Sequence, residues 1–128
     1  MPGTPVHDAL APTLLNGTIS TTANGSAVRV DRPGIVRMRL VNTTISGTSP
    51  TLDVEVEASD SSTFASGVVS LGKFDTVSSA NQERYLTVDV KKRYVRAAHT
   101  VGGTSPSFAG VKVTMEERRY DWAETDSA

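Results

Sequence analysis

Cysteine is missing from this sequence of 128 residues, and aromatic residues are few, with one Trp, three Tyr and three Phe. Without cysteine, neither disulfide bonds nor thiolate metal ligands can contribute to stability, which is consistent with a reducing compartment. Neither sign of charge is in excess, because 13 Lys and Arg stand against 14 Asp and Glu, for a net charge of −1. Such a balance gives no global attraction to nucleic acid or to an anionic membrane, so we expect partners to be recognised by shape and local contacts.

Long apolar runs and helical periodicity are also missing. No segment is long and apolar enough to span a bilayer, and the N-terminus has no basic stretch followed by an apolar run. We therefore expect a soluble protein without a classical secretion signal. The length predicts one domain that buries roughly two-thirds of the surface its unfolded chain would expose.

The sequence does contain many short stretches in which polar and apolar residues alternate. Two examples are Arg37-Met38-Arg39-Leu40 and Asp53-Val54-Glu55-Val56-Glu57. Alternation of period two places the apolar residues on one face of a strand and the polar residues on the other. The same period recurs at Val28-Arg29-Val30, Tyr85 to Val90 and Val111 to Met115. Clusters of Gly, Ser, Asn, Asp and Pro separate these segments, and together they predict an all-β protein: an antiparallel β-sandwich or jelly-roll-like barrel with extended N- and C-terminal arms.

The tetrapeptide Gly-Thr-Ser-Pro occurs twice, at residues 47–50 and 103–106, each time between two extended runs rich in Thr and Val. Gly permits backbone angles that other residues avoid, and Pro biases the preceding Ser49 or Ser105 to extended geometry. The repeat therefore predicts two similar strand–corner–strand units. One interpretation is a simple pair of turns in one β-domain, and the other is that both turns lie at one end of a sandwich and form part of a docking rim. The candidate rim residues are Thr48, Pro50, Thr104 and Pro106.

The two ends of the chain depart from the strand pattern. Three prolines and small residues predict an N-terminal arm over residues 1–17, ahead of a β-sandwich domain over 18–116. Residues 117–128 predict a C-terminal tail that holds the only Trp of the chain. Trp122 either folds back onto its own sandwich or, with Tyr120, anchors on a neighbouring subunit. The candidate partner-binding residues of the two ends are Val6, Leu10, Leu14, Arg119, Tyr120 and Trp122.

Residues that could perform chemistry are scarce. His7 and His99 have no Cys, His or carboxylate nearby at metal-ligand spacing, so we expect no zinc site. Asp53, Glu55 and Glu57 share one face of one strand and could gather a divalent cation, but a solvated face, with its repulsion relieved by a cross-strand Arg or Lys, is the favoured interpretation. No phosphate loop, Ser-His-Asp order or nucleophile elbow is present. We therefore expect no catalytic residue, no cofactor and no metal, and a protein that is not an enzyme.

Two further motifs do not change this expectation. The basic cluster Lys91-Lys92-Arg93 could contact phosphate, but its neighbours Tyr85 and Tyr94 lie on strands that should bury them, so we expect no nucleic-acid partner. Asn16-Gly17-Thr18 and Asn42-Thr43-Thr44 match glycosylation acceptors, and the lack of a signal peptide makes both matches incidental.

The run from Gly47 to Asp60, together with Lys92-Arg93-Tyr94-Val95-Arg96 and Val101 to Phe108, resembles a group of small β-sandwich structural proteins of tailed bacteriophages. Such proteins are often encoded among the head genes, close to the major capsid protein, and the resemblance covers about Thr18 to Met115. It implies a decoration or cement protein that binds the outside of the capsid lattice and bridges major capsid subunits, or else a minor head or tail component. It also implies assembly in the host bacterial cytoplasm and brings no catalytic residue. A homo-oligomer, trimer or dimer, is expected on the shell, at a local three-fold or two-fold position.

Two alternatives remain open at the level of sequence. The first is another virion component, such as a tail-tube, tail-terminator or head–tail connector subunit, which would form rings and would need long loops or an extra hairpin. The second is a carbohydrate- or surface-binding β-sandwich module, which favours exposed aromatic platforms that this sequence largely lacks.

Overall fold

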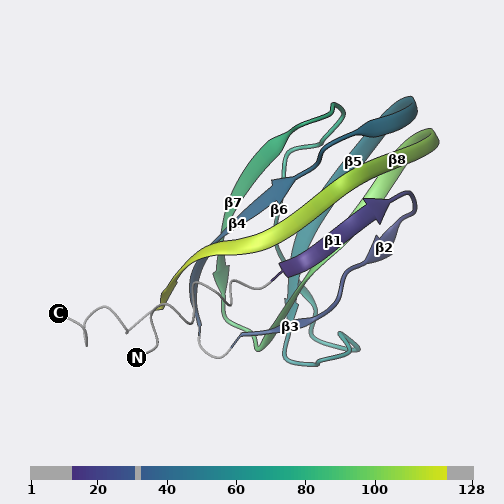
Figure 1. Ribbon diagram of the computed structural model, residues 1–128. Coiled ribbons are helices and arrows are strands. Elements are labelled where there is room, and N and C mark those ends of the chain that lie inside the picture. Colours follow the sequence, from purple (N-terminus) through teal and green to yellow (C-terminus); the bar gives the residue numbers. More distant parts are fainter. Residues whose placement is uncertain (1–12, 31–32, 121–128) are drawn as a thin grey trace.

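The computed structural model describes residues 13–30 and 33–120, and the side chains of these residues up to 116. Every regular element within these ranges is a β-strand (Figure 1), so the all-β prediction is confirmed. The strands are β1 (Thr13–Ile19), β2 (Ala23–Asn24), β3 (Val28–Arg29), β4 (Gly34–Val41), β5 (Ile45–Ser59), β6 (Val69–Lys73), β7 (Glu83–Val90) and β8 (Tyr94–Tyr120). The described ranges contain no helix long and apolar enough to cross a membrane.

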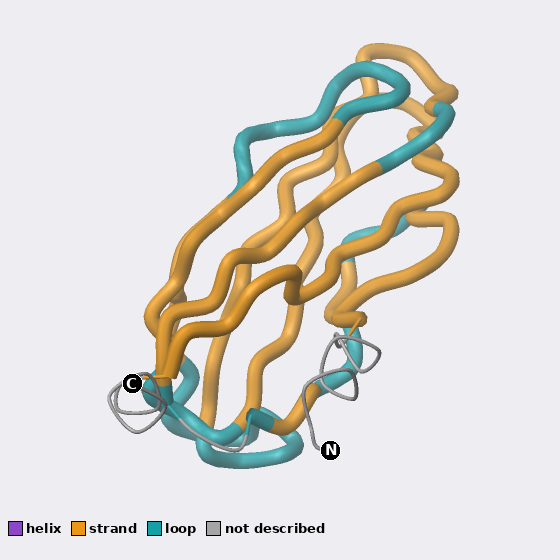
Figure 2. Tube along the Cα trace, turned by 60° about the vertical axis from the view of Figure 1, so that its left-hand side comes forward, coloured by secondary structure: helices purple, strands orange, loops and turns teal. Residues whose placement is uncertain are grey.

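The strands form two antiparallel layers that share the long strands β5 and β8 (Figure 2). One layer has the order β7–β4–β8–β1 and uses the second half of β8, residues 107–120. The other layer has the order β6–β5–β8 and uses the first half of β8, residues 94–102, which also pairs with the short strands β2 and β3. Because β5 and β8 bend from one layer to the other, the sheet nearly closes into a barrel. The predicted antiparallel sandwich is therefore present in this form.

Strict alternation decides which residues form the core between the layers. On β5, Leu52, Val54, Val56 and Ala58 have no exposed surface, whereas the acidic residues between them are half-buried. The main buried side chains from the other long strands are Val36, Met38, Leu40, Val88, Val95, Phe108, Val111, Val113 and Met115. Each buried Val or Leu contributes about 1.5–3 kcal/mol relative to an exposed one, so a one-residue slip in register, which would turn the whole set outward, is strongly disfavoured.

Strand structure begins earlier than the sequence predicts. β1 starts at Thr13 and pairs with β8 as far as Ile19, and Leu14 is only 2% exposed within the core. The predicted arm over residues 1–17 is therefore wrong for residues 13–17, and residues 1–12 lie outside the described ranges. The pattern was hidden because Leu14 and Leu15 are adjacent, and a register shift between Thr13 and Leu15 breaks the alternation.

Strand structure also continues past residue 116. The backbone of β8 pairs with β4 as far as Tyr120, which lies opposite Gly34. The predicted start of the tail at residue 117 is therefore wrong for residues 117–120. A register shift between Arg37 and Met38 of β4 leaves Glu116 of β8 without an opposite residue, so the alternation is interrupted where the charged residues begin.

Candidate functional site

The two Gly-Thr-Ser-Pro segments meet at one end of the molecule, where β5 and β8 fold over from one layer to the other (Figure 1). Thr48 pairs with Thr104, and the register shifts on the side of Ser46 and on the side of Thr51. We call residues 47–50 and 103–106 the corner end. The prediction that both turns lie at one end of a sandwich is confirmed.

The two corners pack against each other reciprocally. A Cβ atom on Gly47 would lie 2.6 Å from the carbonyl oxygen of Ser105, and one on Gly103 would lie 2.6 Å from that of Ser49. Both glycines also have positive φ angles, +106° and +101°. The crossing is thus so close that backbone meets backbone, and glycine is required at both positions.

The serines before the two prolines adopt a conformation that the sequence does not predict. Ser49 and Ser105 have φ angles of +48° and +49°, in the left-handed region, so the expected extended geometry is wrong. The bias that proline imposes on its predecessor is overridden because the chain must turn sharply within the tight crossing. A non-glycine residue in this region costs on the order of 1 kcal/mol or more, and the contacts of the opposite corner hold it there.

The pairing around the corner end has an approximate two-fold symmetry. Residues 38–59 and residues 94–115 form one antiparallel ribbon. If 56 (103 minus 47) is added to the number of a residue in the first segment and subtracted from the number of its partner, the two new numbers are again a pair of the ribbon. Corresponding pairs are Ile45–Phe108 and Val101–Leu52, and Val41–Lys112 and Ala97–Val56. Backbone hydrogen bonds join Thr43 and Thr44 to Ala109 and continue the ribbon between β4 and β5. The similarity of the two strand–corner–strand units rests on their matching backbone angles, at Gly47 and Gly103 and at Ser49 and Ser105.

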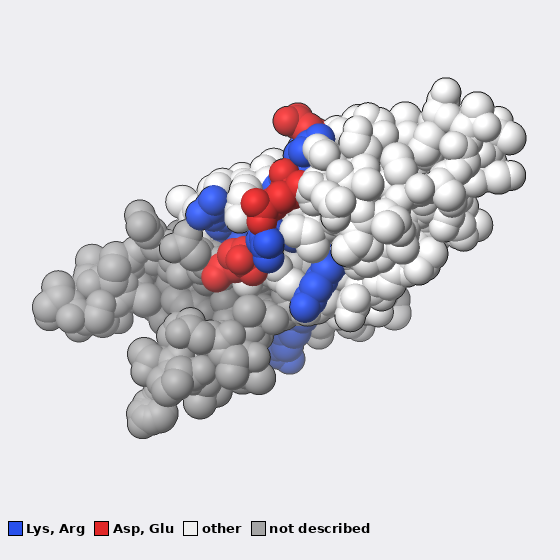
Figure 3. All heavy atoms as spheres, turned by 45° about the horizontal axis from the view of Figure 1, so that its top comes forward, with Lys and Arg blue, Asp and Glu red and all other residues white. Residues whose placement is uncertain are grey.

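The corner end is exposed and carries no charge. Thr48, Ser49, Thr104 and Ser105 are exposed, while Pro50 and Pro106 are half-buried, so the two corners show the same pattern. The segments that contain the two corners, residues 40–52 and 97–111, have no Lys, Arg, Asp or Glu. Figure 3 shows charged side chains gathered in a band across the middle of one face, with uncharged atoms extending to the corner end. The surface there consists of hydroxyl groups, glycine and backbone.

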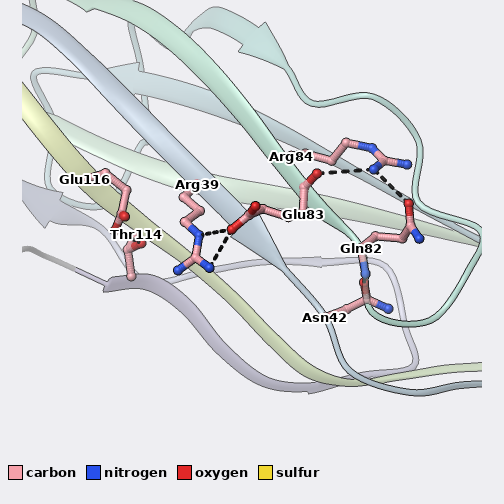
Figure 4. Close-up of polar contacts among 7 residues, drawn as sticks. All are labelled: Arg39, Asn42, Gln82, Glu83, Arg84, Thr114 and Glu116. Carbon is pink, nitrogen blue, oxygen red and sulfur yellow. Dashed lines mark hydrogen bonds and ion pairs between the residues drawn. The ribbon is translucent and has the colours of Figure 1, made fainter.

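A buried amide fastens the β6–β7 connection beside this end. Asn42 is 4% exposed, and its Nδ2 donates to the carbonyl oxygen of Ser79 while its Oδ1 accepts from the backbone of Gln82, at 3.1 and 3.0 Å (Figure 4). The side chain of Asn42, which belongs to the glycosylation match Asn42-Thr43-Thr44, is thus hydrogen-bonded inside the fold. These two hydrogen bonds hold the β6–β7 connection in place beside the corner end.

Two of the three carboxylates in the acidic row on β5 lie beside basic side chains, and the third, Glu55, accepts a hydrogen bond from Ser70. Lys73 Nζ lies 3.8 Å from an oxygen of Asp53, and Arg96 Nε donates to Glu57 at 2.9 Å. The predicted relief by cross-strand basic residues is confirmed. A shallow depression of about 230 Å³ lies between Asp53, Glu55 and Lys73, below the usual size of a small-molecule pocket, roughly 300–1,000 Å³. Within the part of the chain described, no three His, Cys, Asp or Glu side chains are grouped so as to hold a metal ion.

The outer face of the β4–β7 pair carries charged side chains that contact other side chains of the same face. Arg39 Nε and Nη2 both lie 2.6 Å from one oxygen of Glu83 (Figure 4), and this hydrogen bond raises the pKa of Arg39 and lowers that of Glu83. Both groups are exposed to solvent, so the pair stabilises the fold little. The guanidinium of Arg37 lies 4.1 Å from the ring centroid of Tyr85 and covers one face of this exposed aromatic. The expectation that its strand buries Tyr85 is therefore wrong, because the side chain lies on the outer face of β7.

His99 lies inside β8, as predicted, with its side chain turned into the interior. It is 6% exposed and pairs through its backbone with Ala23 of β2 and Val54 of β5. Its Nδ1 has no hydrogen-bond partner among the described residues. Burial lowers the pKa of His99, and a hydrogen bond with the backbone of Thr21 raises it by a smaller amount. The ring is therefore held neutral in the fold near neutral pH.

The structure thus brings together the four candidate rim residues, Thr48, Pro50, Thr104 and Pro106, and places Leu14 and the backbone of Arg119 and Tyr120 away from them. Leu14, expected to anchor a partner, is instead part of the core because it belongs to β1. The backbone of Arg119 and Tyr120 is in β8, but their side chains lie outside the described part, as do Val6, Leu10 and Trp122. Ser49 and Ser105 are two further exposed residues of the rim that were not among the candidates, although the repeated tetrapeptide contains both.

No protein-family model matches this chain, and no curated protein matches it. Among solved structures, it is similar to the Clostridium thermocellum N-terminal endo-1,4-β-D-xylanase 10B, CBM22-1 and GH10 modules complexed with xylohexaose, with a TM-score of 0.46 and 12% identity. That similarity covers 82% of this chain and 28% of the xylanase chain. A likeness at this level carries no argument about what the present chain binds.

Proposed function

We propose that this chain is a virion structural protein of a tailed bacteriophage, a decoration or cement protein that binds the outside of the capsid lattice and bridges major capsid subunits. The observation that carries the proposal is the separation, on one packed sandwich, of two regions: the corner end, and the places where the described chain begins and ends. An exposed, uncharged corner end lies at one pole, and the described chain begins and ends in the half away from it (Figure 1).

The separation of the two regions follows from the register. Thr13 pairs with Thr114, eight residues beyond Pro106 (114 minus 106), and Tyr120 lies farther along the same strand. At about 3.3 Å per residue, eight residues of strand span roughly 26 Å. The described chain therefore begins and ends far from the corners, so contacts at its two ends and contacts at the corner end would fall on separate parts of the molecule.

Two separate contacts are what a cement protein needs. A shell subunit joined to its neighbour by an added protein can open only if several contacts break together, and a ligand that binds the intact lattice alone shifts stability toward that lattice. The packed core between the layers supplies the fixed spacer. The resemblance of residues 47–60, 92–96 and 101–108 to small β-sandwich structural proteins of tailed bacteriophages supports membership of the virion.

The alternatives find less support in the surface. The connections between the described strands do not exceed nine residues, at 60–68 and 74–82, so within the described ranges there is no long loop or extra hairpin of the kind expected for ring stacking. A carbohydrate-binding module would favour a free aromatic platform, and one face of the Tyr85 ring, exposed on β7, is occupied by the guanidinium of Arg37.

The test is to locate the chain on particles of the phage that encodes it. Cryo-microscopy of intact virions should show its copies on the outer surface of the head, and particles that lack the protein should break at lower temperature than decorated ones. Readdition of the purified protein should restore the higher temperature. A position in the tail, or equal robustness of heads with and without the protein, would overturn the proposal and favour the alternative virion component.

A further inference from the structure

We infer that the corner end docks across a two-fold axis between two identical partner subunits, so that one chain contacts both subunits with the same four-residue motif. This inference rests on the proposed function, in which the partner is a pair of adjacent major capsid subunits. The docking face of the sandwich is then the corner end, and the docking position on the shell is a two-fold axis.

The first argument is the duplication of the surface chemistry. Thr48 and Thr104 are both exposed and face each other across the crossing, and each is followed by an exposed serine and a half-buried proline. A surface that presents the same groups twice about an approximate two-fold axis can make equivalent contacts with two identical subunits only when those subunits are themselves related by a two-fold axis. A single chain can then bridge the pair without a second copy of itself.

The second argument is the absence of charge. No Lys, Arg, Asp or Glu occurs in residues 40–52 or 97–111, so docking at the corner end buries no charged side chain of this protein. Burying an unpaired charge would cost several kcal/mol, whereas hydroxyl and backbone groups can form hydrogen bonds with a protein surface. Binding through this face should therefore depend little on ionic strength, unlike binding through the charged outer faces.

The third argument is the rigidity of the two motifs. Gly47 packs against the carbonyl of Ser105 and Gly103 against that of Ser49, so each corner fixes the position of the other. A surface that is already ordered before binding loses little conformational entropy on docking. The spacing between the two motifs is thus set by the fold and not by the partner.

The experiment uses the full chain and empty shells assembled from the major capsid protein of the same phage. We expect one bound copy for every two subunits at a local two-fold position, seen directly by cryo-microscopy. Thr48→Arg and Thr104→Arg should each weaken binding by about tenfold or more, and by similar factors, as for central interface residues. The matched control is Thr87→Arg, at an exposed position of β7 on the sandwich side, which should bind as the original chain does.

The outcomes separate the two proposals. If the chain covers the shell while both corner variants bind normally, or if its density lies away from every two-fold axis, the docking inference is wrong and the decoration role stands. If the chain does not bind the shell, both proposals are wrong. Circular dichroism and urea unfolding report whether each variant is folded, and the cryo-microscopy of the original chain decides the docking site without any variant. A strong loss of binding between about 50 and 500 mM salt would also contradict an uncharged docking face.

Discussion

Gly47 and Gly103 occupy equivalent places in the crossing of β5 and β8, and each lies against the carbonyl group of the serine two residues after the other. Neither glycine could carry a side chain without moving the opposite corner. The two residues are 56 positions apart in the sequence (103 minus 47), yet the local fold depends on both in the same way.

Gly47→Ala and Gly103→Ala should therefore destabilise the domain by similar amounts, roughly 2–4 kcal/mol, because each combines a positive φ with a collision against backbone. Urea unfolding would measure this loss of stability, provided that the dependence of the free energy of unfolding on urea concentration is the same as in the original chain. Gly67→Ala is the matched control, since Gly67 also has a positive φ, +63°, but a Cβ there would meet nothing within 4 Å. It should cost only about 1 kcal/mol. Equal losses at Gly47 and Gly67 would show that the close crossing contributes nothing.

Leu14→Ala should destabilise the domain by roughly 2–5 kcal/mol, because this side chain fills the core where β1 covers the second half of β8. Thr13→Ala, at the exposed neighbouring position, should change the free energy of unfolding by less than about 0.5 kcal/mol. Thermal and urea unfolding of the two variants decide between a core residue and a partner anchor. A normally stable Leu14→Ala variant that binds shells poorly would support the anchor.

Val54→Asp should unfold the domain. Val54 has no exposed surface, and an unpaired buried carboxylate costs several kcal/mol against a total stability of roughly 5–15 kcal/mol. Glu55→Gln, at the adjacent position on the outer face, should leave the far-UV circular dichroism spectrum and the urea midpoint nearly unchanged. A folded Val54→Asp variant would mean that β5 does not pack with this face inward.

Stability should fall as the pH is lowered below about 6.5, the usual pKa of histidine, because burial lowers the pKa of His99 in the folded state. Between the two pKa values the unfolded chain binds a proton that the folded chain excludes, so stability decreases by at most about 1.4 kcal/mol per pH unit for this group. It levels off below the folded pKa. His99→Leu should reduce this dependence in urea titrations at a series of pH values, and His7→Gln serves as the control for the other histidine. An unchanged pH profile in His99→Leu would show that His99 is not the group responsible.

The alternation of side chains was sufficient to predict the all-β class and the inward residues of the long strands, because burial on one face leaves a period of two in the sequence. The ends of β1 and β8 escaped prediction where bulges break that period, at the adjacent Leu14 and Leu15 and beside Glu116. The repeated tetrapeptide was enough to place two corners. The positive φ of Ser49 and Ser105 was not predictable, since it is imposed by contact between segments far apart in the sequence, against the local preference of a residue before proline.

The two ends of the ribbon differ in the length of chain between paired residues, and this difference affects how the chain folds. Ser59 and Tyr94, at one end of the ribbon, are 35 residues apart (94 minus 59), whereas Met38 and Met115, at the other end, are 77 apart (115 minus 38). Closing the shorter loop loses less chain entropy, so pairing should start near Ser59 and extend toward the corner end, and the second layer should form only after both corners have turned. Substitutions in the first half of β8 should accordingly slow refolding, and those in its second half should mainly accelerate unfolding.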